Sequence, residues 1–158
     1  EFGPLISAEQ RSRVAGFVDA GRKEGAEVVC GGNAPTRPGY FFEPTVLART
    51  RNDMTPVKSE IFGPVLCVQT FGDDDLDSVA RAANSTIYGL SGSVWTRDLG
   101  TAMKMVRKID SGQVSVNMHA AIDPAMPFGG NKQSGWGREF GKEGLEPYLK
   151  TKGISMTW

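Results

Sequence analysis

Residues 93–117 read SVWTRDLGTAMKMVRKIDSGQVSVN, and this stretch predicts a strand, a helix and a second strand. The strands are the β-branched runs 93–96 and 113–117. The helix is indicated by Asp98, a suitable N-cap residue, and by the apolar residues that follow it at helical spacing: Leu99, Ala102, Met103 and Val106. Short connections between the three elements favour a right-handed crossover joining two parallel strands.

The same pattern precedes this stretch. A β-branched, apolar run at 64–71 (PVLCVQTF) predicts a strand, and Asp73 to Asp75 supply caps for a helix with Leu76, Val79, Ala80 and Ala83 on one face. The order strand, helix, strand, helix, strand predicts the α/β class, with a mainly parallel sheet flanked by helices.

The first third of the chain adds a helix and shorter extended segments. Ser7 to Gln10 has the spacing of a capping box, and Gly25 offers a left-handed stop, so we expect a helix at 7–24. The run AEVVC at 26–30 predicts a buried strand in which Cys30 is a small core residue, and 45–47 suits a sheet edge beside Pro44. A short helix is expected at 142–148, followed by an extended run at 152–158.

Composition excludes several classes of partner. The chain has 158 residues, of which 39% are hydrophobic, and its 18 basic and 18 acidic residues give a formal charge of zero. Neither a nucleic-acid partner nor a membrane partner is expected, because there is no basic run and no long apolar stretch. Two cysteines and one histidine make a metal site improbable, and a cytoplasmic location is expected.

Three chemical motifs fail on spacing or context. Residues 89–93 (GLSGS) miss the nucleophile-elbow pattern by one position and precede a strand, which argues against a hydrolase using Ser91 and His119. Gly135, Gly137 and Gly141 imitate a dinucleotide fingerprint without the preceding strand. Cys67 lies in an apolar strand, where desolvation raises a thiol pKa and suppresses the thiolate.

Glu60 and Phe62 form the remaining candidate, in the stretch EIFGPV at 60–65. An ionised carboxylate accepts hydrogen bonds with two oxygens and suits a pair of sugar hydroxyls, while an aromatic ring two residues later packs against the same ligand. A solvated turn acid beside a core phenylalanine is the alternative, and the residues by themselves leave both readings open.

Resemblance to a known family decides between them. EIFGPV resembles the cofactor-contact motif of the aldehyde dehydrogenase superfamily, and PFGGNKQSG at 127–135 followed by GRE at 137–139 resembles that family's C-terminal signature. Further similarity runs through GPLI at 3–6, GYF at 39–41, EPTV at 43–46 and YGL at 88–90, so nearly the whole chain is covered. Asn117 to His119, with Asp123 and Pro124, is most similar to aromatic-aldehyde members such as the phenylacetaldehyde dehydrogenases.

The resemblance implies oxidation of an aldehyde to a carboxylic acid with NAD or NADP, through a cysteine thiolate, hydride transfer and hydrolysis of a thioester. Glu60 matches the glutamate that holds the nicotinamide ribose, and Phe62 matches the phenylalanine that supports the nicotinamide end. Phe128 matches a position that lines the aldehyde tunnel. Met118 and His119 lie in the segment 118–126, which matches the loop that shapes substrate choice.

The same resemblance implies what the chain lacks. Neither Cys30 nor Cys67 matches the nucleophile, and the matching base and Rossmann cofactor domain would precede residue 3. We therefore expect a C-terminal fragment that is inactive alone, with residues 1–148 as part of the catalytic domain and 149–158 as a strand for subunit contacts in a homo-oligomer. The alternative is a stand-alone, noncatalytic interaction module that copies the dimerising surface; a start codon just upstream of Glu1 would favour it.

Overall fold

The computed structural model describes residues 2–72, 75–119 and 122–158 and divides into two compact units. The first unit ends at Asp75 and the second begins at Leu76. No helix among the described residues combines the length and the apolar character needed to cross a bilayer.

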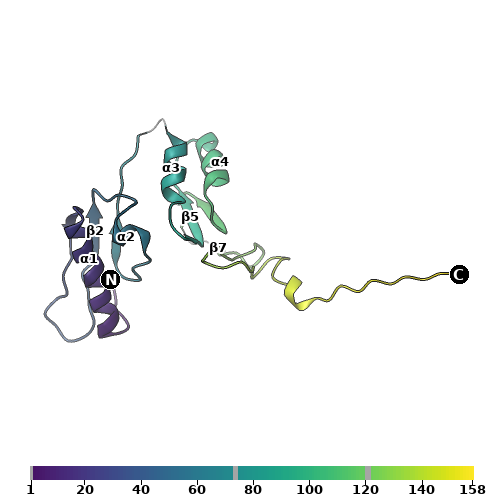
Figure 1. The fold of residues 1–158 in the computed structure, drawn as a ribbon, viewed down its shortest axis with the longest axis horizontal. Coiled ribbons are helices and arrows are strands. Elements are labelled where there is room, and N and C mark those ends of the chain that lie inside the picture. Colours follow the sequence, from purple (N-terminus) through teal and green to yellow (C-terminus); the bar gives the residue numbers. More distant parts are fainter. Residues whose placement is uncertain (1, 73–74, 120–121) are drawn as a thin grey trace. The chain divides into compact units, whose positions relative to one another are not determined.

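The first unit begins with helix α1 (Ala8–Lys23), close to the predicted bounds. Ser7 caps it by accepting a hydrogen bond from the Gln10 backbone amide at 3.1 Å, and Gly25 follows its end with a φ of 97°. The left-handed conformation at Gly25 is the helix stop that the sequence predicts. Helix α1 lies beside the short helix α2 (Thr55–Lys58) (Figure 1).

A three-stranded sheet forms the other layer of this unit. Strand β2 (Thr45–Ala48) is central, with β1 (Glu27–Cys30) antiparallel on one side and β3 (Val65–Cys67) parallel on the other. The prediction that 45–47 lies at a sheet edge is therefore wrong. The core between the layers contains Val14, Val18, Ala26, Phe42, Leu47, Met54 and Ile61.

The edge position of β1 also corrects the prediction for Cys30. Because β1 has a partner on one side only, most of its side chains are exposed, and Cys30 is among them. Cys30 is thus a surface thiol and not a core residue.

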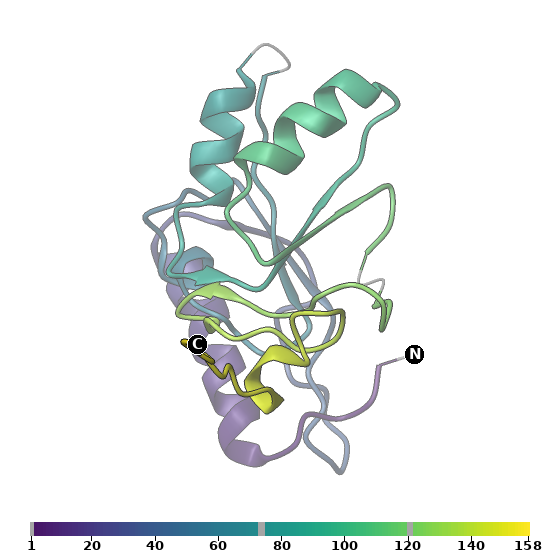
Figure 2. The same cartoon turned by 90° about the vertical axis from the view of Figure 1, so that its right-hand side faces the viewer.

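The second unit begins with helix α3 (Leu76–Ala83), while Asp73 and Asp74, expected to cap it, lie outside the described residues. Strand β5 (Ser91–Val94), helix α4 (Leu99–Lys108) and strand β6 (Gln113–Val116) follow. Strands β5 and β6 pair in parallel, as residues 93–117 predict, and Asp98 caps α4. Helices α3 and α4 lie side by side in both views (Figures 1 and 2).

Two short elements complete the second unit. Strands β4 (Tyr88–Gly89) and β7 (Asn131–Lys132) pair antiparallel, and the expected helix at 142–148 is only the 3₁₀ turn η1 (Glu146–Tyr148). Among the described strands two pairings are parallel and two antiparallel, in three separate sheets. The α/β class is confirmed, whereas the mainly parallel sheet is not.

Residues 149–158 carry no helix or strand, and every one of them is exposed. The boundary at 148 and the role of the final segment in subunit contacts stay predictions.

Candidate functional site

The loop that carries Glu60 and Phe62 connects α2 to β3. The Ile61 side chain packs into the core and is only 7% exposed. Its two neighbours in sequence are exposed: Glu60 before it, and Phe62 after it, which has 75% of its surface accessible. The buried isoleucine anchors the loop, and the two candidate ligand-binding side chains face solvent. No hydrogen bond to the Glu60 carboxylate is present in the described part of the chain.

Two side chains of α1 hold this loop by its backbone. The Gln10 Nε2 group donates to the carbonyl oxygens of Ile61 at 3.1 Å and Phe62 at 2.7 Å. Arg13 donates from Nη1 to the Ile61 carbonyl at 2.7 Å and from Nη2 to the Glu60 carbonyl at 2.8 Å. Three consecutive carbonyls are therefore fixed by residues three apart on one helix face.

Sequence reasoning missed the roles of Gln10 and Arg13. Their only local signal is a polar pair at i and i+3 beside the buried Val14, a pattern shared by many solvated helix faces. Their partners lie about fifty residues later in the chain, which no local pattern reveals.

Phe62 adopts a left-handed backbone conformation with a φ of 53°. For a bulky non-glycine residue this conformation costs on the order of 1–3 kcal/mol and persists only where neighbouring contacts enforce it. Gly63 supplies such a contact, because a Cβ atom there would lie 2.5 Å from Val14 Cγ2. The loop thus runs against α1 with no space for a larger residue.

The predicted substrate-pocket residues belong to the second unit. Phe128 is half-buried and exchanges two backbone hydrogen bonds of 2.7 Å with Glu139, and its ring lies 6.4 Å from that of Phe140 at an angle of 54°. Met118 and His119 follow the carboxyl end of β6 and are exposed. Residues 120 and 121, in the middle of the predicted substrate-choice segment 118–126, lie outside the described residues.

His119 contacts a serine, although a different one from the Ser91 weighed above. Its Nδ1 atom lies 2.9 Å from Ser93 Oγ, which projects from β5. A hydrolytic triad also needs a carboxylate that orients the histidine. Within the described residues no carboxylate bonds to the His119 ring, so this pair lacks the third member of a hydrolase site.

Neither cysteine is placed as an activated nucleophile. Burial raises the pKa of the Cys67 thiol, as its apolar strand predicts, and its Sγ donates to the Pro56 carbonyl at 3.7 Å. Cys30 Sγ donates weakly to the Pro44 carbonyl at 3.8 Å. Both thiols therefore contact backbone carbonyls, and neither contacts a histidine that could remove its proton.

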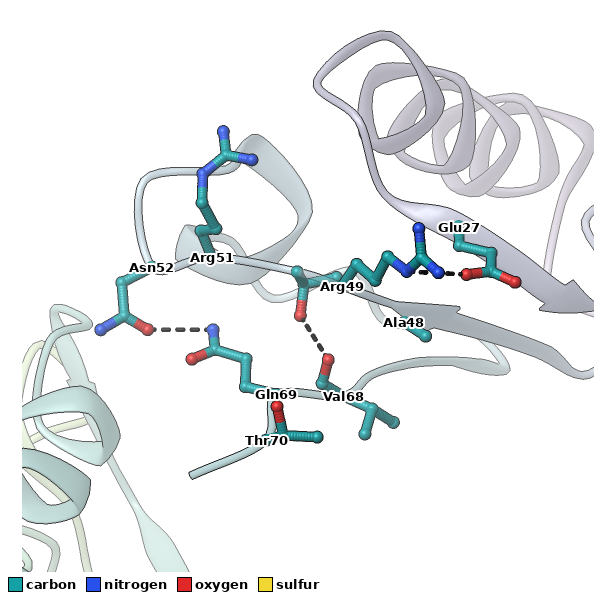
Figure 3. A pocket seen from close by; sticks show the side chains of 9 residues that line it. Glu27, Ala48, Arg49, Arg51, Asn52, Val68, Gln69 and Thr70 are labelled. Atoms are coloured by element: carbon teal, nitrogen blue, oxygen red, sulfur yellow. Dashed lines mark hydrogen bonds and ion pairs between the residues drawn. The ribbon is translucent and has the colours of Figure 1, made fainter. Parts of the chain in front are cut away.

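A cavity of about 410 Å³ lies elsewhere in the first unit, beyond the carboxyl ends of β2 and β3 (Figure 3). Arg49 and Arg51 line it, but Arg49 is paired with Glu27 at 3.1 Å and Arg51 with Asp53 at 3.1 Å. The basic groups are thus already neutralised by the protein's own carboxylates. Across residues 2–72, 75–119 and 122–158, no group of histidine, cysteine and acidic side chains is arranged to hold a metal ion.

Comparison with known proteins supplies the context for these residues. The model of the aldehyde dehydrogenase family matches residues 1–154. Betaine aldehyde dehydrogenase of Bacillus subtilis is 43% identical, with 98% of this chain and 32% of the relative covered. Human mitochondrial 10-formyltetrahydrofolate dehydrogenase is 40% identical, with 100% of this chain and 17% of that protein covered.

Solved structures agree with this assignment. The NAD-dependent aldehyde dehydrogenase of Sinorhizobium meliloti superposes with a TM-score of 0.93 at 39% identity, covering 99% of this chain and 31% of that one. An NAD⁺ complex of an aldehyde dehydrogenase from Bacillus cereus gives 0.89 at 43% identity, covering 95% and 30%. The chain spans a third or less of the length of these proteins, and on this evidence it belongs to the aldehyde dehydrogenase family.

Proposed function

We propose that the chain forms the C-terminal part of the catalytic domain of an NAD- or NADP-dependent aldehyde dehydrogenase, which oxidises an aldehyde to a carboxylic acid. The observation that carries the proposal is the loop at 60–63. Its backbone is fastened to α1, while the Glu60 carboxylate and the Phe62 ring remain exposed and free to meet a ligand. The family membership supports the same reading.

Glu60 would bind the ribose hydroxyls next to the nicotinamide. An ionised carboxylate only accepts hydrogen bonds, and its two oxygens match two neighbouring hydroxyl donors. No side chain in the described residues occupies these acceptors, which leaves them available to the cofactor. When bound, NAD or NADP would supply the acceptor for the hydride that leaves the substrate.

Phe62 would pack against the nicotinamide end of the same cofactor. Its exposed ring is an apolar surface that gains by burial against a ligand. The NAD⁺ complex of the B. cereus relative supports NAD as the cofactor class. NAD and NADP remain alternatives, because the groups that distinguish their 2′ substituents are not among these residues.

Phe128, Met118 and His119 would line the aldehyde pocket. A half-buried phenylalanine and an exposed methionine offer apolar, polarisable surface, which suits an aromatic aldehyde. We propose an aromatic aldehyde as substrate on this chemistry. None of the relatives named above carries an aromatic aldehyde in its name, so this preference rests on the residues of this chain.

The chain by itself should not oxidise aldehydes. Burial raises the pKa of the Cys67 thiol, and within the described residues the Cys30 thiol contacts a backbone carbonyl, so neither cysteine is placed as an activated nucleophile. We expect residues 1–158 to produce no NADH from NAD⁺ and phenylacetaldehyde. An alternative function as a noncatalytic interaction module predicts the same inactivity and therefore needs a separate test.

Residues 149–158 would mediate subunit contacts in either case. Ile154, Met156 and Trp158 alternate along this segment and are all exposed, which is the pattern of a strand with one apolar face. Adding this strand to the sheet of a second copy would bury that face. Light scattering tests this, because deleting 149–158 should convert an oligomer to a monomer, and a wild-type chain that is monomeric at high concentration would contradict it.

The decisive test of the site is Glu60→Gln in the full-length polypeptide that carries this chain. The amide keeps the size of the side chain but loses one acceptor oxygen and the charge. We expect kcat to fall about tenfold to hundredfold, because small misplacement of reacting groups is costly. The kinetic isotope effect with aldehyde deuterated at C1 should rise, since hydride transfer then limits turnover.

Glu9→Gln is the matched control. Glu9 is an exposed carboxylate in the first turn of α1, within the same unit, and its loss should leave kcat and the isotope effect unchanged. Equal behaviour of the two variants would exclude Glu60 from the site.

A further inference from the structure

The Phe128 backbone is held by a single pair with Glu139 and not by a continuous strand. Each residue donates its amide to the other's carbonyl at 2.7 Å, in an isolated bridge outside the named strands. One isolated pair is a weak constraint, so the place of the Phe128 ring depends on what fixes the segment between them.

Arg138 ties the two arms of this segment together. Its Nη1 group donates to the carbonyl of Gly130 at 2.8 Å and to that of Gly137 at 2.9 Å. Its Nη2 group donates to Asn131 Oδ1 at 2.7 Å. One guanidinium therefore joins the residues just after Phe128 to those just before Glu139.

Asn131 connects this clamp to the end of helix α4. Its Nδ2 group donates to Asp110 Oδ1 at 3.0 Å. The Asp110 backbone amide in turn donates to Asn84 Oδ1 at 2.8 Å, and Asn84 Nδ2 donates to the Lys108 carbonyl at 2.7 Å. Asn84 directly follows α3, so the chain of hydrogen bonds ends on the carboxyl termini of both helices.

Close backbone packing makes this arrangement sensitive to displacement. A Cβ atom on Gly129 would lie 2.3 Å from the Gly137 carbonyl oxygen, and one on Gly112 would lie 1.6 Å from the Gly129 carbonyl oxygen. The backbones therefore approach as closely as glycine permits, so a small displacement of either segment would bring them into a clash.

We propose that Asn131 and Arg138 are positioning residues that hold the Phe128–Glu139 pair, and with it the Phe128 ring, in register with the ends of α3 and α4. The proposal rests on the proposed function only in assigning Phe128 to the aldehyde pocket. An arginine suits the role because its planar fork reaches three acceptors at once, which a lysine ammonium on a flexible stem does not fix in place.

Hydrogen exchange of the Phe128 and Glu139 amides in residues 1–158 tests the clamp. Arg138→Ala removes three hydrogen bonds, and we expect both amides to exchange at least about tenfold faster. Arg138→Lys should give an intermediate rate. Arg97→Ala is the control, since Arg97 is exposed in the same unit and has no hydrogen bond within the described residues, and it should leave both rates unchanged.

If Arg138→Ala fails to fold, swapping the amide and carboxylate side chains at positions 131 and 110 provides a second test. Asn131→Asp keeps the acceptor for Arg138 but faces the Asp110 carboxylate with a second one, so exchange should accelerate. Adding Asp110→Asn restores the hydrogen bond between positions 110 and 131, with the amide donor now at position 110 and the carboxylate acceptor at position 131. The exchange rates of the Phe128 and Glu139 amides should then return toward wild type. Unchanged exchange in Asn131→Asp, or no recovery in the double variant, would overturn the proposal.

Kinetics of the full-length polypeptide separate this inference from the proposed function. If Phe128 lines the pocket, Asn131→Asp should raise KM for the aldehyde while KM for NAD⁺ stays constant, and the double variant should restore it. Faster exchange with an unchanged aldehyde KM would support the clamp and refute the placement of Phe128 in the pocket.

Discussion

Replacing Gly63 by alanine tests how the loop that carries Glu60 and Phe62 is supported. The new Cβ atom would lie 2.5 Å from Val14 Cγ2 and 3.0 Å from Val14 Cγ1, against about 3.5–4.0 Å for carbon atoms in favourable contact. Val14 is fully buried, and a β-branched side chain in a helix has essentially one rotamer. The clash must therefore move the loop.

The magnitude follows from two opposing effects. Inserting a methyl group into a well-packed core costs about 1–3 kcal/mol. Gly63 does not have a positive φ, so alanine recovers about 0.4–1 kcal/mol from the smaller entropy of the unfolded chain. We expect a net loss of about 1–2 kcal/mol in the free energy of unfolding of the first unit.

Native-state hydrogen exchange at the α1 amides is the suitable assay. All three tryptophans, Trp95, Trp136 and Trp158, lie in the second unit, so tryptophan fluorescence does not report on α1. Gly16→Ala is the matched control, because Gly16 is an α1 residue with no atom within 4 Å of an added Cβ. Alanine should stabilise that position by about 0.5–1 kcal/mol.

A double-mutant cycle isolates the contact with Val14. Val14→Ala removes both clashing methyl groups, and the nearest remaining atom would be Val14 Cβ at 3.4 Å. The loss in the free energy of unfolding of the double variant should therefore be smaller than the sum of the losses in the two single variants, by about 1–2 kcal/mol. Additive free energies, within about 0.5 kcal/mol, would refute the proposed close packing of the loop on α1.

Three further predictions follow from local contacts. Asp98→Ala should reduce the helicity of α4 measured by circular dichroism, whereas Asp98→Asn should preserve it, because the amide oxygen still accepts from the first turn. Hydrogen bonds from the hydroxyl and backbone amide of Thr55 lower the pKa of Glu24. The ionised Glu24 carboxylate therefore stabilises the fold above its ordinary pKa of 4.5, and this contribution is lost as the pH falls through the lower pKa of the folded chain. Glu24→Gln should remove this acid-dependent loss of stability in pH-jump denaturation. Iodoacetamide should alkylate Cys30 before Cys67 in the folded chain and both at similar rates in urea, as peptide mass mapping would detect.

Elements with local signals could be predicted from the sequence. The caps at Ser7 and Asp98 act within three residues, and both helices begin where these residues indicate. The β5–α4–β6 unit is similarly local, because its strands are joined by a single helix. Resemblance to the family was needed for the hypothesis about Glu60 and Phe62, since the residues by themselves favour a solvated turn acid beside a core phenylalanine.

Elements that depend on distant partners could not be predicted. Helix α2 has only four residues, and Glu24, at the end of α1, satisfies its first amide across 31 positions. The exposure of Cys30 depends on β1 lying at the edge of a sheet whose order is set by long-range pairing. The supports of the site, Gln10 and Arg13, have the same origin, because the carbonyls that they bind belong to a loop about fifty residues away.

The loop at 60–63 in the first unit and the segment 128–139 in the second unit share one mode of support. Gln10 and Arg13 bind the carbonyls at 60–62, and Arg138 binds the carbonyls of Gly130 and Gly137, so in both units long polar side chains hold a loop by its backbone. Because every residue has a backbone carbonyl, this kind of support does not depend on which side chains occupy positions 60, 62 and 128. If the proposed roles of these three residues hold, a substitution at any of them should alter binding with little change in fold. A substitution at Arg13 or Arg138 should instead loosen the supported backbone while every side chain proposed to contact a ligand remains present. Loss of cofactor or aldehyde affinity with intact site residues is thus the signature that separates a support from a ligand-binding residue in this chain.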